Sequence, residues 1–255
     1  PNGGGAYIVA RENLGETAAL VAGSALLTDY VLTVAVSISS GVAQIVSAFP
    51  DLAGYRVPLA VGIIAFVTLI NLRGVKESGS VFAIPTYFFL AMMFITLAVG
   101  FYRWANGTLG VVTGVEFATE TAAPLTLFLI LRAFSSGSTA LTGIEAISNG
   151  ITAFREPKSH NAAATLTVMS TLLVTLFLGI TFLSRHIEAI PSHEETIISQ
   201  LARTVYGEGS IFYLFVIAGT ALILLMAANT SYADFPRLAA LQAADGFLPR
   251  QLTYR

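Results

Sequence analysis

Three ionisable residues lie inside long apolar stretches of this 255-residue chain: Asp29, Arg132 and Glu145. A charge at membrane depth costs free energy, so residues of this kind are candidates for function. A carboxylate such as Asp29 needs a proton, a cation or an arginine as its partner there. The chemistry that these positions could perform is therefore the binding and exchange of a small cation or a proton.

A row of polar residues follows Asp29. Tyr30, Thr33 and Ser37 are spaced i, i+3 and i+7, which places them on one helix face. Three further residues extend that face: Ser40, Gly41 and Gln44. A membrane helix with a single polar stripe faces protein or a watery cavity. For the small residues of this face the alternative is close helix packing.

A second polar element interrupts the apolar run 122–153. Seven of the ten residues from Ser135 to Ile144 are Ser, Thr or Gly, and Glu145 follows them. A polar, glycine-containing interruption within a span predicts a broken helix, whose freed carbonyls and half-helix ends can bind a cation. The alternative is an unbroken helix with a Ser/Gly-rich packing face. Arg132 could pair with Asp29 or Glu145 and give that carboxylate a purely structural role.

Long apolar runs must position these residues, and there are six of them: 18–48, 57–72, 81–102, 122–153, 162–183 and 211–228. Because a bilayer-spanning helix needs about 20 mainly apolar residues, they predict six transmembrane helices with the fourth one broken. The predicted fold class is all-α integral membrane, with residues 1–255 in a single transmembrane domain. Residues 232–244 are expected to form a further helix, with residues 229–231 satisfying the backbone at the end of the last span.

Composition excludes several functional classes. The chain is 55% hydrophobic and only 11% charged, and its mean hydropathy is +0.75. These values argue against a water-soluble enzyme and a disordered protein. The net charge of −2 gives no basic footprint for nucleic acid. Without cysteine there is no thiol chemistry, and the three histidines have no metal-ligand spacing. We expect no enzymatic activity and no cofactor.

Basic residues predict the orientation. If the N-terminus is cytoplasmic, eight Lys and Arg residues fall on the inner side of the membrane and four on the outer side. The positive-inside rule favours that arrangement, with Lys76 and Lys158 inside and His193 outside. In the outer stretch, Ser192 and Glu195 match a capping box before an amphipathic segment that Gly207 can end. We expect a surface helix there, either a connector or part of an outer gate.

Four stretches resemble the amino acid–polyamine–organocation (APC) permeases. Residues 1–7 resemble the loop before the third transmembrane helix, and Leu141–Ala146 resembles the broken sixth helix. Residues 154–161 and 245–249 resemble the loops after helices six and eight. The resemblance implies the LeuT-type inverted-repeat fold and alternating access, with this chain as helices three to eight of twelve. We therefore expect a fragment of a longer transporter that does not transport by itself.

Within the superfamily, the motifs D-Y-x-x-T-x-x-x-S from Asp29 and T-G-I-E from Thr142 resemble KimA-type potassium–proton symporters. By that resemblance, four residues contribute oxygen to potassium: Tyr30, Thr33, Ser37 and Thr142. Asp29 and Glu145 carry charge for ion or proton coupling, and Thr139 adds a hydroxyl near the break. We expect the polar face of the first span to meet the break, so that Thr33 faces Thr142 across a cavity.

The function implied is proton-coupled potassium uptake by a secondary active transporter in the plasma membrane. Potassium and protons are the transported species, the lipid bilayer is the partner, and a homodimer is left open. The main alternative is a proton-coupled amino-acid permease, in which the broken helix holds a zwitterion. A non-transporting membrane sensor does not explain a polar broken helix opposite an acidic, hydroxyl-lined face. A channel is disfavoured because no repeated filter-like loop is visible.

Overall fold

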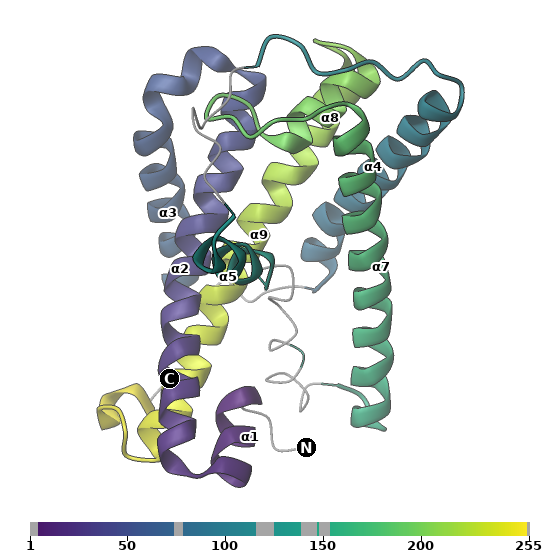
Figure 1. Ribbon diagram of the computed structural model, residues 1–255. Coiled ribbons are helices and arrows are strands. Elements are labelled where there is room, and N and C mark those ends of the chain that lie inside the picture. Colours follow the sequence, from purple (N-terminus) through teal and green to yellow (C-terminus); the bar gives the residue numbers. More distant parts are fainter. Residues whose placement is uncertain (1–4, 74–78, 116–124, 139–146, 148–153, 254–255) are drawn as a thin grey trace. The chain divides into compact units, whose positions relative to one another are not determined.

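Helices make up most of the computed structural model, which describes residues 5–73, 79–115, 125–138, 147 and 154–253. No strand occurs among these residues. Within these ranges five helices are long and apolar enough to span a membrane: α2 (Glu16–Ala48), α3 (Arg56–Leu72) with the 3-10 turn η1 (Pro50–Tyr55) before it, α4 (Gly79–Ala105), α7 (Lys158–His186) and α9 (Ile211–Ala244) (Figure 1). The shorter helices are α1 (Gly5–Leu14), α5 (Leu127–Gly137), α8 (Ile197–Tyr206) and η4 (Arg250–Thr253).

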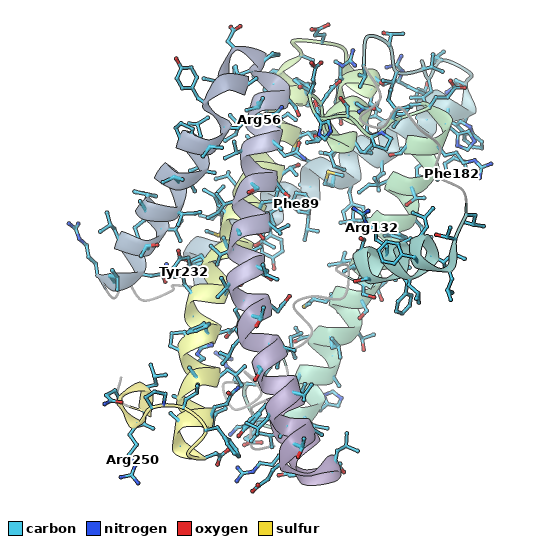
Figure 2. All side chains as sticks on the ribbon, turned by 60° about the vertical axis from the view of Figure 1, so that its left-hand side comes forward. Arg56, Phe89, Arg132, Phe182, Tyr232 and Arg250 are labelled. Atoms are coloured by element: carbon cyan, nitrogen blue, oxygen red, sulfur yellow. The ribbon has the colours of Figure 1, made fainter. Side chains whose placement is uncertain are left out.

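The long helices expose apolar side chains (Figure 2). In the span formed by η1 and α3 only 6% of the most apolar 18-residue stretch is buried, and Val57, Phe66 and Leu69 are exposed. A water-soluble protein does not leave rows of large apolar residues uncovered. The acyl chains of a bilayer cover such a surface without cost, so these faces fit a multi-pass membrane protein.

Helix α9 is longer than the apolar run that predicts it. It continues without interruption from Ile211 to Ala244, so residues 229–231 lie inside the helix. The expectation that these polar residues end a helix is therefore wrong. Their side chains find partners instead: Thr230 donates to the Ala227 carbonyl, and the Asn229 Oδ1 atom accepts from Asn71 on α3. The chain leaves the helix at Gly246, whose φ of 86° suits glycine.

The fourth apolar run contains α5. The Thr126 side chain caps this helix by accepting from the Leu129 amide, and the helix ends at Gly137, inside the Ser/Thr/Gly-rich stretch. Residues 139–146 and 148–153 lie outside the described residues. The break between two half-helices therefore remains a prediction, as does a membrane span over the fourth apolar run, 122–153.

The chain divides into two compact units. One contains residues 1–31, 121–174 and 233–255, and the other contains residues 32–120 and 175–232. The first unit has a small core in which α1, α2 and α9 contribute one buried cluster: Tyr7, Ala19, Tyr30 and Leu238. In the second unit, Ile38, Val42 and Val46 of α2 form a cluster with Ala228 of α9.

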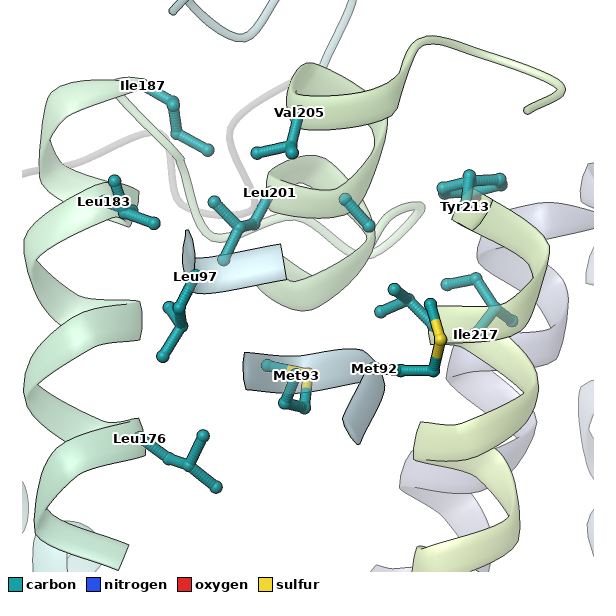
Figure 3. Packing of buried hydrophobic residues seen from close by; sticks show 12 residues of the cluster. Met92, Met93, Leu97, Leu176, Leu183, Ile187, Leu201, Val205, Tyr213 and Ile217 are labelled. Atoms are coloured by element: carbon teal, nitrogen blue, oxygen red, sulfur yellow. The ribbon is translucent and has the colours of Figure 1, made fainter. Parts of the chain in front are cut away.

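The larger core of the second unit lies where α4, α7, α8 and α9 converge (Figure 3). Its α4–α7 contact depends on glycine. A Cβ atom on Gly179 would lie 2.7 Å from Leu97 Cδ1, and one on Gly100 would lie 2.6 Å from Leu183 Cδ1. Each leucine thus occupies the space above a glycine of the other helix, which is how membrane helices gain close packing.

Candidate functional site

The polar face of α2 is turned into the protein, as its spacing predicts. Tyr30, Ser37 and Gln44 are buried, with exposed fractions of 4, 8 and 5%. Residues on the other side of the same helix, such as Val31 and Val36, are exposed. Since a hydroxyl or amide in lipid would lack partners, burial of this face gives its polar groups a protein environment.

The candidate ion ligands of α2 fall in both units. Asp29 and Tyr30 belong to the first unit, and Thr33 and Ser37 belong to the second. Asp29 and Thr33 are half-buried, and both take part in polar or electrostatic interactions. The structure thus places a carboxylate, a phenol and two hydroxyls on consecutive turns of one helix.

The other half of the predicted site is the break in the fourth apolar run. Thr139, Thr142 and Glu145 lie outside the described residues, so the facing of Thr33 and Thr142 stays a prediction. Arg132 is described, and its side chain is exposed on α5 (Figure 2).

The C-terminal part of the polar face holds neighbouring helices. Gly41 lies against α9, where a Cβ atom would meet Leu225 Cδ1 at 3.3 Å. The Thr196 hydroxyl donates to Gln44 Oε1 at 2.9 Å, and the Thr196 amide donates to Ser47 Oγ at 3.0 Å. Gly41 therefore packs against α9, and Gln44 binds the residue at the start of α8.

The surface helix forms where its apolar spacing predicts, but its cap is different. Helix α8 starts after Thr196, whose side chain accepts from the Ser199 amide, and it ends at Gly207 with a φ of 89°. Ser192 accepts from the Glu194 amide within the preceding loop. The capping box at Ser192 is thus wrong, because the loop turns there and the helix begins four residues later.

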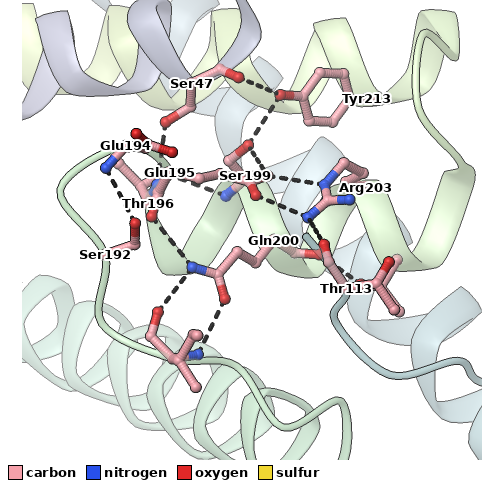
Figure 4. Close-up of polar contacts among 12 residues, drawn as sticks. Ser47, Thr113, Ser192, Glu194, Glu195, Thr196, Ser199, Gln200, Arg203 and Tyr213 are labelled. Atoms are coloured by element: carbon pink, nitrogen blue, oxygen red, sulfur yellow. Dashed lines mark hydrogen bonds and ion pairs between the residues drawn. The ribbon is translucent and has the colours of Figure 1, made fainter. Parts of the chain in front are cut away.

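Glu195 pairs with arginine (Figure 4). Its carboxylate accepts from Arg203 Nε at 3.1 Å, from Arg203 Nη2 at 2.9 Å and from Ser199 Oγ at 2.8 Å. These charge-assisted hydrogen bonds raise the pKa of the Arg203 guanidinium. Tyr213 of α9 joins the network: its hydroxyl lies 2.9 Å from Ser199 Oγ and donates to the Ser47 carbonyl. The network fastens α8 to α2 and α9.

A pocket of about 770 Å³ opens beside this network. Its lining includes three carboxylates, Glu194, Glu195 and Glu208, and two guanidinium groups, Arg56 and Arg203. Because Glu195 and Arg203 neutralise each other, two carboxylates and one guanidinium remain, and the balance favours cations at this opening.

A polar cluster in the first unit joins distant parts of the chain. The Tyr7 hydroxyl of α1 donates to Asp245 Oδ2 at 2.7 Å, and Arg11 forms an ion pair with the other oxygen. The Tyr7 hydrogen bond, with Arg11, holds the pKa of Asp245 below its usual value. Burial, with this carboxylate nearby, raises the pKa of Tyr7 to about 12. The cluster therefore keeps one charge state across physiological pH.

Sequence reasoning missed a buried carboxylate on α9. Asp234 is 8% exposed and accepts from Arg237 one turn later. Asp234 was not a candidate because the apolar run that predicts the last span ends at Ala228, whereas the helix continues to Ala244. The signal that could have found it is the helical spacing of Ala228, Ser231 and Leu238, which are all buried.

Polar pairs also join α3 to α9. Thr68 Oγ1 lies 2.7 Å from the Tyr232 hydroxyl, and Asn71 Nδ2 donates to Asn229 Oδ1 at 2.7 Å. Side-chain hydrogen bonds of this kind hold membrane helices together. Among the residues described, no three His, Asp or Glu side chains come together as a metal site.

The sequence of this chain is similar to a known protein family and to a known transporter. The sequence model of the family described as "Amino acid permease" matches residues 1–255. The chain is 47% identical over 255 residues to the potassium transporter KimA of Bacillus subtilis (strain 168). That match covers all of this chain and 42% of the relative, so the chain spans less than half of the relative's length.

Proposed function

The chain belongs to the amino acid permease family of the APC superfamily, and we propose that it is part of a secondary active transporter that takes up potassium together with protons. The observation that carries the proposal is the 47% identity to a potassium transporter over the whole chain. The buried polar face of α2 supports it, because Tyr30, Thr33 and Ser37 supply neutral oxygens on consecutive turns beside Asp29.

The ligand chemistry suits a weakly hydrated monovalent cation. Such an ion binds several neutral oxygens with a negative charge nearby, and its selectivity depends on the number and field strength of those oxygens. In the proposed site, Tyr30, Thr33 and Ser37 face Thr142 at the break of the sixth helix of a LeuT-type fold, with Thr139 close by. Asp29 and Glu145 take up protons during the cycle, and a proton competes with the cation for the same charge.

The proposed setting is the plasma membrane, with the N-terminal end of this chain in the cytoplasm. On that orientation residues 184–210 form an outer segment, and residues 1–17 and 229–255 form inner segments. Alternating access would then expose the ion site first to one side and then to the other.

A proton-coupled amino-acid permease is the second candidate, and the description of the matching family favours it. In that case the break at residues 139–145 would hold the amino and carboxylate groups of a zwitterion. The two functions differ in what the transporter accumulates, so uptake measurements separate them.

The test uses a chimera in which residues 1–255 replace the matching segment of the Bacillus subtilis transporter. Expressed in Escherichia coli cells that lack their own potassium uptake systems, the chimera should restore growth at low potassium and accumulate potassium. Uptake of amino acids without potassium would instead support the permease.

Two substitutions in the chimera test the site. Thr142→Val removes one oxygen at nearly constant shape, so it should raise the KM for potassium about 10-fold. Asp29→Asn should flatten the pH dependence of uptake. The matched control is Thr167→Val, because Thr167 is exposed on α7 and its hydroxyl donates to the Ala163 carbonyl of its own helix. A KM that changes as much in the control as in Thr142→Val would refute the assignment.

A further inference from the structure

The Tyr7–Asp245–Arg11 cluster contacts α2 close to the candidate ion ligands. Tyr7 is fully buried, and its ring and Gln242 of α9 both press on Gly23 of α2. A Cβ atom on Gly23 would lie 2.9 Å from Tyr7 Cδ2 and 2.4 Å from Gln242 Nε2. No residue other than glycine fits at this crossing without displacing one of these side chains.

Tyr30 lies on the face of α2 that carries Gly23, and it shares a buried cluster with Leu238 of α9. Gly23 and Tyr30 are seven residues apart, so they lie on one face of α2, two turns from each other. Leu238 and Asp245 have the same spacing at the end of α9. Tyr7, Tyr30 and Leu238 are members of one buried cluster within the first unit. The position of the Tyr30 ring is therefore set by the same packing that Tyr7 and Asp245 hold together.

We infer that Tyr7, Arg11 and Asp245 are positioning residues for potassium binding: they fix α1 against α2 and α9 and thereby hold Tyr30 in its ligand position. The inference rests on the proposed function. Tyr7 and Arg11 are one turn apart on α1 and reach the two oxygens of one carboxylate. Two anchors on one rigid group define the orientation of α1, which a single hydrogen bond would leave free to rotate.

The predicted consequence is a loss of affinity. Removing a group that orients a metal ligand costs about 10- to 100-fold in affinity. Tyr7 acts on Tyr30 through packing rather than through a hydrogen bond, so we expect a smaller effect, about 3- to 10-fold in the KM for potassium. Because these residues do not touch the ion, kcat should stay within about 2-fold of the parent value.

Three variants of the chimera test this. Tyr7→Phe removes one hydroxyl and keeps the ring, Asp245→Asn removes the charge, and Arg11→Gln changes a half-exposed side chain. The control is Glu156→Gln, which removes the solvent-exposed ion pair with Lys158. We expect a raised KM in all three variants at unchanged membrane abundance, an unchanged KM in the control, and near-parental kinetics in the conservative variant Asp245→Glu.

The outcomes separate this inference from the proposed function. If the parent chimera takes up no potassium, the proposed function fails. If the parent transports potassium but Tyr7→Phe and Asp245→Asn keep its KM, the positioning role is wrong. A fall in kcat at constant KM also overturns it, because the cluster then controls the rate of the cycle. If all three variants fail to reach the membrane, the cluster is a folding element and the inference is again refuted.

Discussion

Replacing Glu195 with glutamine tests the network that fastens α8. The substitution keeps the shape of the side chain but removes its charge, and one of its oxygens becomes an NH2 group that faces the donors of Arg203 and Ser199. Three hydrogen bonds end on this carboxylate, at 2.8, 2.9 and 3.1 Å. The change therefore turns at least one of these contacts into a clash of two donors.

The magnitude follows from the burial of the pair. Breaking a fully buried ion pair costs about 3–5 kcal/mol, whereas an exposed pair contributes about 0–1 kcal/mol. The side chains of Glu195 and Arg203 are 13 and 22% exposed, which places the pair nearer the buried limit. We expect a loss of about 2–3 kcal/mol in the free energy of unfolding. At about 2–4 °C per kcal/mol for a unit of this size, the melting temperature should fall by about 4–12 °C.

The assay is thermal unfolding of the purified chimera in detergent, with Glu194→Gln as the matched control. Glu194 is adjacent in sequence and exposed, so its charge should contribute little. Raising the salt concentration should leave the difference between the two variants nearly unchanged, because a buried pair is weakly screened. Equal melting temperatures for the two variants would refute the reasoning that Glu195 is part of a buried network.

Three further predictions concern packing, pH and orientation. Gly179→Val should cost about 1–3 kcal/mol in unfolding free energy by overpacking the α4–α7 contact, and Leu97→Ala should recover part of that loss in a double variant, as thermal melts would show. Because the folded pKa of Asp245 is lowered, its stabilisation is present above the unfolded value near 3.8 and is lost as the pH falls through the folded pKa. The melting-temperature difference between Asp245→Asn and the parent should therefore stay constant from about pH 5 to 8 and shrink below about pH 4. In intact cells an impermeant thiol reagent should label His193→Cys and spare Lys158→Cys, and the reverse pattern would invert the orientation.

Local sequence was sufficient for much of the fold. Runs of about 20 apolar residues can satisfy their backbone in lipid only as helices, so the long helices follow from hydropathy alone. The 3.6-residue period likewise places Tyr30, Ser37 and Gln44 on one face, and that face is buried. The amphipathic spacing after residue 196 predicts α8 in the same way.

Partners across the chain depend on the tertiary structure. Tyr7 and Asp245 are 238 residues apart, and nothing in either local pattern indicates that they meet. Glu195 matches the capping box of a helix that would start after Ser192, yet its carboxylate binds Arg203, because α8 starts after Thr196, four residues later.

The polar residues 229–231 show the same difference between what local sequence indicates and what the tertiary structure decides. By itself this stretch is a plausible end of a helix, since its side chains can compete for backbone groups. In the structure α3 lies beside it and Asn71 offers a partner, so the helix continues through and carries Asp234 and Asp245 with it.

The sequence by itself determined which segments are apolar helices and which faces are polar, because both depend on neighbours within a few residues. Which polar groups meet across helices was decided only by the tertiary structure, because it depends on which helices pack side by side.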